Sequence, residues 1–428
     1  MTTRTGWQRQ TEGLGVWEHR GKVAITGVGH SPTDRRWDGK TFETSLGYYS
    51  ILAAQKAMGD AGVTPEQIDG VITCPDPMGE SWTPRPYFDP PYDSEDGLTL
   101  VTPEWLTNQL GLNNVKYFGN APQIGEMMGF AAQAVGDGLC NTCLVLYPTG
   151  NIEGRYHHAG ENASDYAEGG RQWGVPYGYH AGALMRMTMA FNMDCRRYGR
   201  SHEGLAPFAV NQRRNGLMVP WGFYALHEPY QITAEDYLAA RWIHKPLKLL
   251  DCDRPVNASA CYLFTTAERA RDMNQKPVYI LSHEQSNRKP RSLMPTLDEV
   301  EGYCDNLARR VWEGSGLGPQ DVDVFNPYDG YLTFTQFFLE AFQWHGVKRG
   351  EAHDFYAGDI RVEGPHPFLS SGGNNGTGRT RTALFTDSVE QLQGRAGERQ
   401  IKIRAETALA GCNTPDGSGW IMVSTNPN

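Results

Sequence analysis

Apolar residues fall into short continuous runs that alternate with helically spaced positions along much of the chain. Residues 22–28 form an apolar, β-branched run that predicts a strand. Residues 45–62 carry apolar side chains three and four positions apart and end at a glycine, which predicts a helix. Residues 68–73 predict the next strand. We expect this order to form a parallel pair of strands covered by the helix.

The pattern of this first segment returns 254 residues later. The sequences at 62–71 (GVTPEQIDGV) and 316–325 (GLGPQDVDVF) carry Gly, Pro and Asp at equivalent positions. The same offset aligns KVAI at 22–25 with KPVY at 276–279. Two features in one register predict an internal duplication. The second copy is expected to contain strands at 278–281, 322–325, 401–405 and 420–424 and helices at 297–314, 333–344 and 380–392.

Two long segments without a hydrophobic period interrupt the first copy. The first is rich in proline and aromatic residues and the second in Gly, Tyr and His, which is typical of functional loops. The predicted organisation is an arm (1–21), a first half (22–270) with inserted loops at 80–97 and 151–182, and a second half (271–428).

Composition narrows the class of protein. The 428 residues include 39 Lys and Arg against 49 Asp and Glu, and a net charge of -10 argues against nucleic acid as a partner. No apolar run approaches the roughly 20 residues of a membrane span, and no secretory signal opens the chain, so we expect a cytoplasmic protein. Eight cysteines are too sparse for a disulfide scaffold. Cys140 and Cys143 form the only CxxC, which we interpret as structural, so no metal site is expected.

Two turns lead into predicted buried helices and are the first candidates for a binding site. One is at Asn120 and Ala121, and the other is the glycine loop at 370–379 (SSGGNNGTGR). The loop has neither the Lys-Ser/Thr of a phosphate loop nor a strand running into it. Helix N-termini would suit the oxyanion of a thioester. The candidate oxyanion and substrate-binding residues are Asn120, Ala121, Gly373, Gly376, Gly378, Cys412 and His366.

Several motifs resemble the thiolase superfamily, most closely its lipid-transfer, sterol-carrier-protein branch. They are WIHKPLKLLD at 242–251, TAERARD at 266–272, GEAHDF at 350–355 and LSSGG at 369–373. The resemblance implies an α/β, thiolase-like, five-layered α-β-α-β-α fold built from two duplicated halves. The two-fold repeat found above agrees with this expectation.

Three departures from the family pattern bear on function. The family's nucleophilic cysteine falls at Asn120 or Ala121, its catalytic histidine at Arg379, and the branch's second histidine at Tyr328, followed by Asp329. Steroid side-chain-cleaving aldolases similarly lack the cysteine and have Tyr-Asp at this place, although they have a second tyrosine where this chain has Arg379.

The resemblance to these aldolases implies retro-aldol cleavage of a bulky, steroid-like β-hydroxyacyl-CoA to a ketone and a short acyl-CoA, with no cofactor besides the CoA of the substrate. Tyr328 is the candidate general base, and a neighbouring Arg379 would lower its pKa. Asp329 either orients the turn or takes part in the reaction. Tyr331 is the alternative candidate for the role of Tyr328. Each residue also has a purely structural alternative. The Tyr328 hydroxyl could be buried and bonded to the backbone, and Arg379 could form an ion pair in the core.

The family also implies partners, namely a second copy of the chain in a homodimer and a small subunit with an OB-fold and a zinc ribbon. Two other functions stay open. One is an acyltransferase or thiolase with a displaced nucleophile, for which Cys412 is the candidate thiol. The other is a non-catalytic subunit that only binds acyl-CoA.

Overall fold

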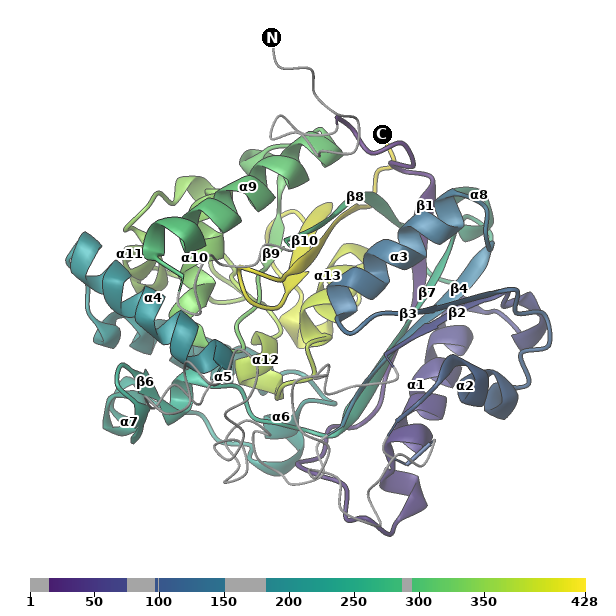
Figure 1. Ribbon diagram of the computed structural model, residues 1–428, viewed down its shortest axis with the longest axis horizontal. Helices are drawn as coiled ribbons and strands as arrows, with labels where there is room; N and C mark the ends of the chain where they lie inside the picture. Colours follow the sequence, from purple (N-terminus) through teal and green to yellow (C-terminus); the bar gives the residue numbers. More distant parts are fainter. Residues whose placement is uncertain (1–14, 75–96, 99, 151–181, 287–294) are drawn as a thin grey trace, which may run out of the picture.

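The computed structural model describes residues 15–74, 97–98, 100–150, 182–286 and 295–428 (Figure 1). The inserted loops expected at 80–97 and 151–182 therefore lie almost entirely outside the described residues, as does most of the arm at 1–21. None of the described helices combines the length and the apolar character that a membrane span requires.

A nine-stranded mixed sheet forms the framework of the described residues, in the order β3-β2-β4-β7-β1-β8-β11-β10-β9. A separate hairpin joins β5 (Trp242–His244) to β6 (Leu247–Lys248). The strands of the large sheet are β1 (Val23–His30), β2 (Gly70–Thr73), β3 (Tyr117–Asn120), β4 (Thr142–Thr149), β7 (Ala258–Thr266), β8 (Val278–Gln285), β9 (Val324–Asn326), β10 (Thr407–Cys412) and β11 (Gly419–Ser424).

The strand order is symmetrical about the junction of β1 with β8. Moving outward, β7, β4 and β2 on one side correspond to β11, β10 and β9 on the other. Helices α1 (Leu46–Ala61) and α9 (Leu297–Ser315) both end at a glycine in the left-handed conformation, Gly62 and Gly316. These glycines are 254 residues apart, so the offset of the sequence repeat is also the offset of the structural repeat.

The expected pairing of the first two strands is wrong. β1 and β2 do run parallel, but β7 and β4 lie between them, with β1 antiparallel to β7 and β2 parallel to β4. The helix α1 crosses over both of the intervening strands, because it packs on β1, β7 and β4 together. The sequence order of strand, helix and strand does not reveal strands inserted later in the chain.

The helices and the two halves of the nine-stranded sheet form five layers, as the family resemblance implies (Figure 1). Helix α3 (Ile124–Gly136) packs against β4 and β7 of the first copy and against β8 and β11 of the second. With α13 (Ala383–Gln393) it forms the middle layer. The outer layers are α1 with α2 (Pro103–Leu110) and α9 with α10 (Leu332–Phe342).

The described chain contains seven further α-helices. They are α4 (Gly182–Tyr198), α5 (Ala206–Gly216), α6 (Phe223–His227), α7 (Ala234–Ala239), α8 (Ala267–Ala270), α11 (Ala352–Ala357) and α12 (Gly373–Thr377). The strand expected at 401–405 is wrong, since the strand begins at Thr407. The carboxylate of Asp323 accepts hydrogen bonds from the backbone of Glu406 and Thr407, and sheet pairing starts only after this junction.

Candidate active site

Four strand ends and loops bring a group of ionisable side chains together. Tyr147 lies in β4, Tyr328 follows β9, Cys412 ends β10, and Arg381 lies between α12 and α13. A guanidinium nitrogen of Arg381 (Nη1) donates to the Tyr147 hydroxyl at 2.9 Å. The charge of Arg381 also acts on Tyr328 and Cys412, so all four side chains share one environment.

Tyr328 is buried with its hydroxyl against Gly330. A Cβ at Gly330 would collide with the hydroxyl oxygen, and the ring stacks on Phe334 with centroids 5.7 Å apart. The Gly330 carbonyl accepts a hydrogen bond from the backbone of Asp253 at 3.0 Å. Asp253 is itself buried, and the charge of its carboxylate acts on Tyr328.

The expected lowering of the Tyr328 pKa is wrong. Burial, and then the negative charge of Asp253, raise this pKa well above its ordinary value. Arg381 and Arg379 act in the opposite direction but do not reverse the shift. Tyr328 is therefore a protonated phenol at neutral pH, suited to donating a proton rather than to accepting one in the resting enzyme.

Asp329 anchors the glycine loop. Its carboxylate accepts hydrogen bonds from the backbone N–H of Asn374 and Asn375 at 2.8 and 3.1 Å and from the side chains of Gln212 and Asn374 at 2.8 and 3.1 Å. Burial nevertheless raises the pKa of Asp329 to about 6, although the hydrogen bonds favour ionisation. With both oxygens engaged, Asp329 is placed to orient the loop.

The glycines of this loop serve close packing, which corrects their expected role as oxyanion donors. Their amide hydrogens are already donated within the loop, from Gly373 to the Ser371 hydroxyl, from Gly376 to the Gly372 carbonyl and from Gly378 to the Asn374 carbonyl. A Cβ at Gly373 would collide with Asp329, and one at Gly376 with the Gln212 carbonyl.

The remaining candidates divide between the site and its surroundings. Tyr331 is buried near Phe334, with centroids 5.6 Å apart, and Arg379 lowers the pKa of Tyr331 although burial raises it overall. His366 is exposed and lies beside His345 and Phe355, in a different aromatic group.

The structure also shows where the turn at Asn120 and Ala121 and the thiol of Cys412 lie. Asn120 is the exposed last residue of β3, and Ala121 is buried just before α3. Their contact with an oxyanion stays a prediction. Burial raises the pKa of Cys412 to about 12 despite Arg381, so its thiol is protonated at neutral pH and poorly suited as a nucleophile.

Sequence reasoning missed Tyr147, Asp253 and Arg381. Asp253 comes two residues after the end of the WIHKPLKLLD motif, and Arg381 two residues after Arg379. The signal in both cases was a charged residue next to a recognised motif. Tyr147 carried no such signal, because an aromatic residue in a buried strand is most often core.

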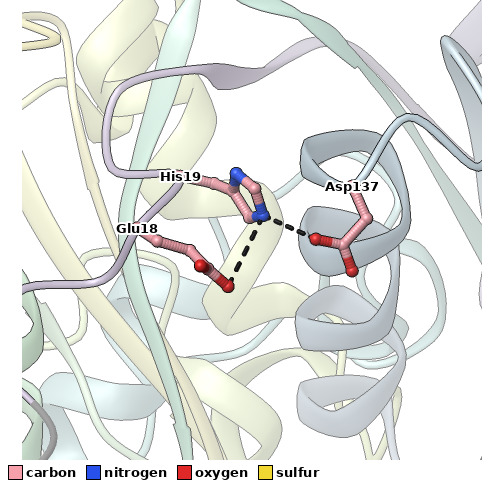
Figure 2. A group of neighbouring side chains, drawn as sticks. All are labelled: Glu18, His19 and Asp137. Carbon is pink, nitrogen blue, oxygen red and sulfur yellow. Dashed lines mark hydrogen bonds and ion pairs between the residues drawn. The ribbon is translucent and has the colours of Figure 1, made fainter.

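One further group of side chains could hold a metal ion within the described part of the chain, namely Glu18, His19 and Asp137. Figure 2 shows Glu18 and His19 facing Asp137 at the end of α3. His19 Nε2 lies 2.6 Å from an Asp137 oxygen and 3.7 Å from one of Glu18. Both carboxylates are exposed, and Gln133 also donates to Asp137 at 3.0 Å. We interpret the group as an ion pair that holds the N-terminal segment on α3, and assign no metal to it.

Comparison with known proteins indicates the class of fold to which this protein is similar. Residues 294–418 match the family described as thiolase C-terminal domain-like. A solved structure named Ltp2-ChsH2(DUF35) aldolase superposes with a TM-score of 0.76 at 22% identity, covering 95% of this chain and 98% of that one. The fold is therefore that of the thiolases, and Asn120 or Ala121, where the resemblance places the family's nucleophile, is not a cysteine.

Two relatives extend the similarity along nearly the whole chain. A 17-hydroxy-3-oxo-4-pregnene-20-carboxyl-CoA lyase of Mycobacterium tuberculosis is 27% identical over 413 residues, covering 94% of this chain and 99% of the relative. A steroid side-chain-cleaving aldolase of Thermomonospora curvata is 27% identical over 426 residues, covering 94% and 98%. Along nearly its whole length the chain is therefore similar to these two relatives, and its fold is that of the thiolases.

Proposed function

We propose that this protein is a carbon-carbon lyase that cleaves a bulky β-hydroxyacyl-CoA by a retro-aldol reaction. The observation that carries the proposal is the combination of an absent nucleophile with a buried acid-base group. The resemblance places the cysteine at Asn120 or Ala121, where this chain has none, while the charge of Asp253 acts on a protonated Tyr328. The names of the relatives support a lyase or aldolase acting on a steroid CoA ester.

The reaction requires removal of one proton and delivery of another. The β-hydroxyl loses its proton, its C–O bond becomes the carbonyl of the ketone, and the bond between Cα and Cβ breaks. The electron pair of that bond passes into the thioester and forms an enolate. Protonation of the enolate at Cα gives the short acyl-CoA. No net proton or electron is consumed, so no cofactor besides the CoA of the substrate is required.

The raised pKa of Tyr328 decides between its two possible roles. We assign its neutral hydroxyl to proton donation at Cα and assign the Asp253 carboxylate to accept the proton of the β-hydroxyl. After one turnover Tyr328 is a phenolate and Asp253 a carboxylic acid, and transfer of a proton between them restores the resting state. Arg379 stabilises the transient phenolate, because it lowers the pKa of Tyr328.

The direct test supplies the purified protein with 17-hydroxy-3-oxo-4-pregnene-20-carboxyl-CoA, the ester in the name of the Mycobacterium tuberculosis relative. We expect a steroid with a ketone at carbon 17 and a three-carbon acyl-CoA in equal amounts, measured by liquid chromatography with mass detection. Binding of the ester without cleavage, in the presence of the partner proposed below, would favour a non-catalytic acyl-CoA-binding subunit. Inactivation by iodoacetamide that tracks labelling of Cys412 would favour the acyltransferase.

The proposed assembly is a homodimer with a small OB-fold, zinc-ribbon subunit. The name Ltp2-ChsH2(DUF35) indicates that the similar aldolase was solved with a second protein, which supports a partner but not its place on this chain. Light scattering after gel filtration of the chain alone and of the co-expressed pair tests both proposals. A monomer with full activity and no bound partner would contradict them. Location in the cytoplasm stays a prediction.

A further inference from the structure

We infer that Arg381 and Tyr147 together bind the oxygen of the thioester enolate. The inference rests on the proposed function and adds the group that stabilises the negative charge. The enolate requires donors because the electron pair of the broken bond places charge on the thioester oxygen. The amides of Gly373, Gly376 and Gly378 cannot supply them, because each is already donated to a group within the loop.

Arg381 is a cation that lacks an anionic partner. Among the described residues no carboxylate lies within ion-pairing distance of it, and the ionisable groups around it are Tyr147, Tyr328 and Cys412. The pKa of each of these three groups is raised, so all are neutral at pH 7. The carboxylates of Asp253 and Asp329 also act on these neutral groups but form no ion pair with Arg381, so this partly buried guanidinium has lost hydration without gaining an ion pair. An anionic ligand would supply the missing charge.

The backbone holds Arg381 in place at some cost. Its φ is 61°, in the left-handed region that non-glycine residues rarely adopt. The Arg381 N–H donates to the side-chain oxygen of Asn374 at 2.7 Å, and the side-chain nitrogen of Asn374 donates to Asp329 at 3.1 Å. Such strain persists where surrounding contacts enforce it, and it is concentrated at functional sites. Asp329 and Asn374 are therefore positioning residues for Arg381.

Tyr147 supplies the second donor. Its hydroxyl oxygen accepts the hydrogen bond from Arg381, so its own hydrogen points elsewhere. Burial raises the pKa of Tyr147, and the phenol therefore keeps that hydrogen. With Arg381 and Tyr147 joined at 2.9 Å, one oxygen atom can receive a hydrogen bond from both. This pair is a side-chain equivalent of the backbone oxyanion hole expected from the sequence.

The decisive experiment measures enolate stabilisation without turnover. Acetoacetyl-CoA forms an enolate with its own near-ultraviolet absorption, and its pKa when bound reports how strongly the site favours the charged form. We expect the pKa of the bound probe to lie at least one pH unit below that of the free probe, a tenfold preference for the enolate. Arg381→Gln and Tyr147→Phe should each remove most of this shift, and Arg381→Lys should keep part of it.

Control measurements separate this effect from misfolding. Arg361→Gln removes an exposed arginine paired with Asp359 and should leave both the probe pKa and the thermal unfolding temperature unchanged. For the variants at 381 and 147, retained affinity for CoA and a cooperative unfolding transition show that the protein is folded. A wild-type probe pKa equal to that in solution, or a folded Arg381→Gln variant with the wild-type pKa, would overturn the inference.

A second measurement distinguishes a failure of this inference from a failure of the proposed lyase function. The α-hydrogens of propionyl-CoA exchange with D₂O only through an enolate, so their exchange tests enolate formation without any cleavage. Exchange that falls on the order of 100- to 1,000-fold in Arg381→Gln supports the inference, whether or not a β-hydroxyacyl-CoA is cleaved. Cleavage by wild type that Arg381→Gln leaves unchanged supports the lyase and overturns the assignment of Arg381.

Discussion

At the scale of single residues, the hydroxyl of Tyr328 is the group on which the proposed reaction depends most. Tyr328→Phe removes the proton donor and leaves the ring that stacks on Phe334. We expect the cleavage rate to fall on the order of 100- to 10,000-fold, with little change in the affinity for the CoA ester. Steady-state rates together with calorimetric binding measure the two effects. Unchanged turnover in a folded variant would remove Tyr328 from the mechanism.

The protonation state of Tyr328 also predicts the pH dependence. Because burial and Asp253 raise its pKa above the ordinary value near 10, the donor stays protonated from pH 7 to 10. The cleavage rate should therefore not increase through this range. A resting phenolate acting as base would instead give a rate that rises tenfold per pH unit. A profile of kcat against pH distinguishes the two cases.

Some residues of the site could be predicted from the sequence and others could not. Tyr328, Asp329 and Arg379 could be proposed as candidates because the resemblance aligns them with recognisable family positions. Arg381 escapes prediction because its orientation depends on a left-handed backbone conformation that nothing in the local sequence requires. The direction of the Tyr328 pKa could not be predicted either, because it depends on how burial compares with the charges of side chains distant in sequence.

At the scale of elements, the glycine loop and α12 are held by Asp329, and this contact predicts a difference between two glycines. At Gly373 φ is 56° and a Cβ would collide with the Asp329 carboxylate, whereas at Gly394 φ is 74° and nothing lies within 4 Å. Gly394→Ala should cost about 1 kcal/mol of unfolding free energy from backbone strain alone. Gly373→Ala should cost several-fold more and abolish activity. Equal losses in denaturant unfolding would contradict the role of this contact.

The same carboxylate links stability to pH. The pKa of Asp329 is about 6 in the folded protein, above the value near 3.9 of an unfolded chain. Its contribution to stability is therefore complete below pH 4 and is lost as the pH rises through 6, by an amount on the order of 2–3 kcal/mol. Asp329→Asn lacks this loss, so its stability relative to wild type should increase between pH 4 and pH 7. Urea unfolding across that range measures the difference, and a constant difference would show that Asp329 does not titrate there.

Elements with strong local signals were predicted well. The helices α1 and α9 begin after Ser45 and Thr296, whose side chains cap them, and end at left-handed glycines. The strand expected at 401–405 failed because apolar alternation does not reveal whether a pairing partner is present. The glycine loop was located correctly, but only the structure shows that its amides are donated internally.

At the scale of the whole molecule, the repeat predicted two copies of one unit but not how they join. β1 and β8 pair through Ala24 with Tyr279 and Ile25 with Val278, a short junction. Much of the remaining contact passes through α3, which comes from the first copy and packs on β8 and β11 of the second. The copies therefore share a core, and neither one buries its apolar surface alone.

This shared core predicts that the halves do not fold separately. Residues 271–428 expressed alone would expose the faces of β8 and β11 that α3 covers and would lack the buried apolar side chains of α3, such as Met127 and Met128. We expect this fragment to show no cooperative thermal transition, because burying such apolar side chains contributes about 2 kcal/mol each. Co-expression with residues 1–270 should restore a folded complex and serves as the control. A fragment that unfolds cooperatively by circular dichroism would show that the second copy is an independent domain, and that α3 only covers a core the copy already has.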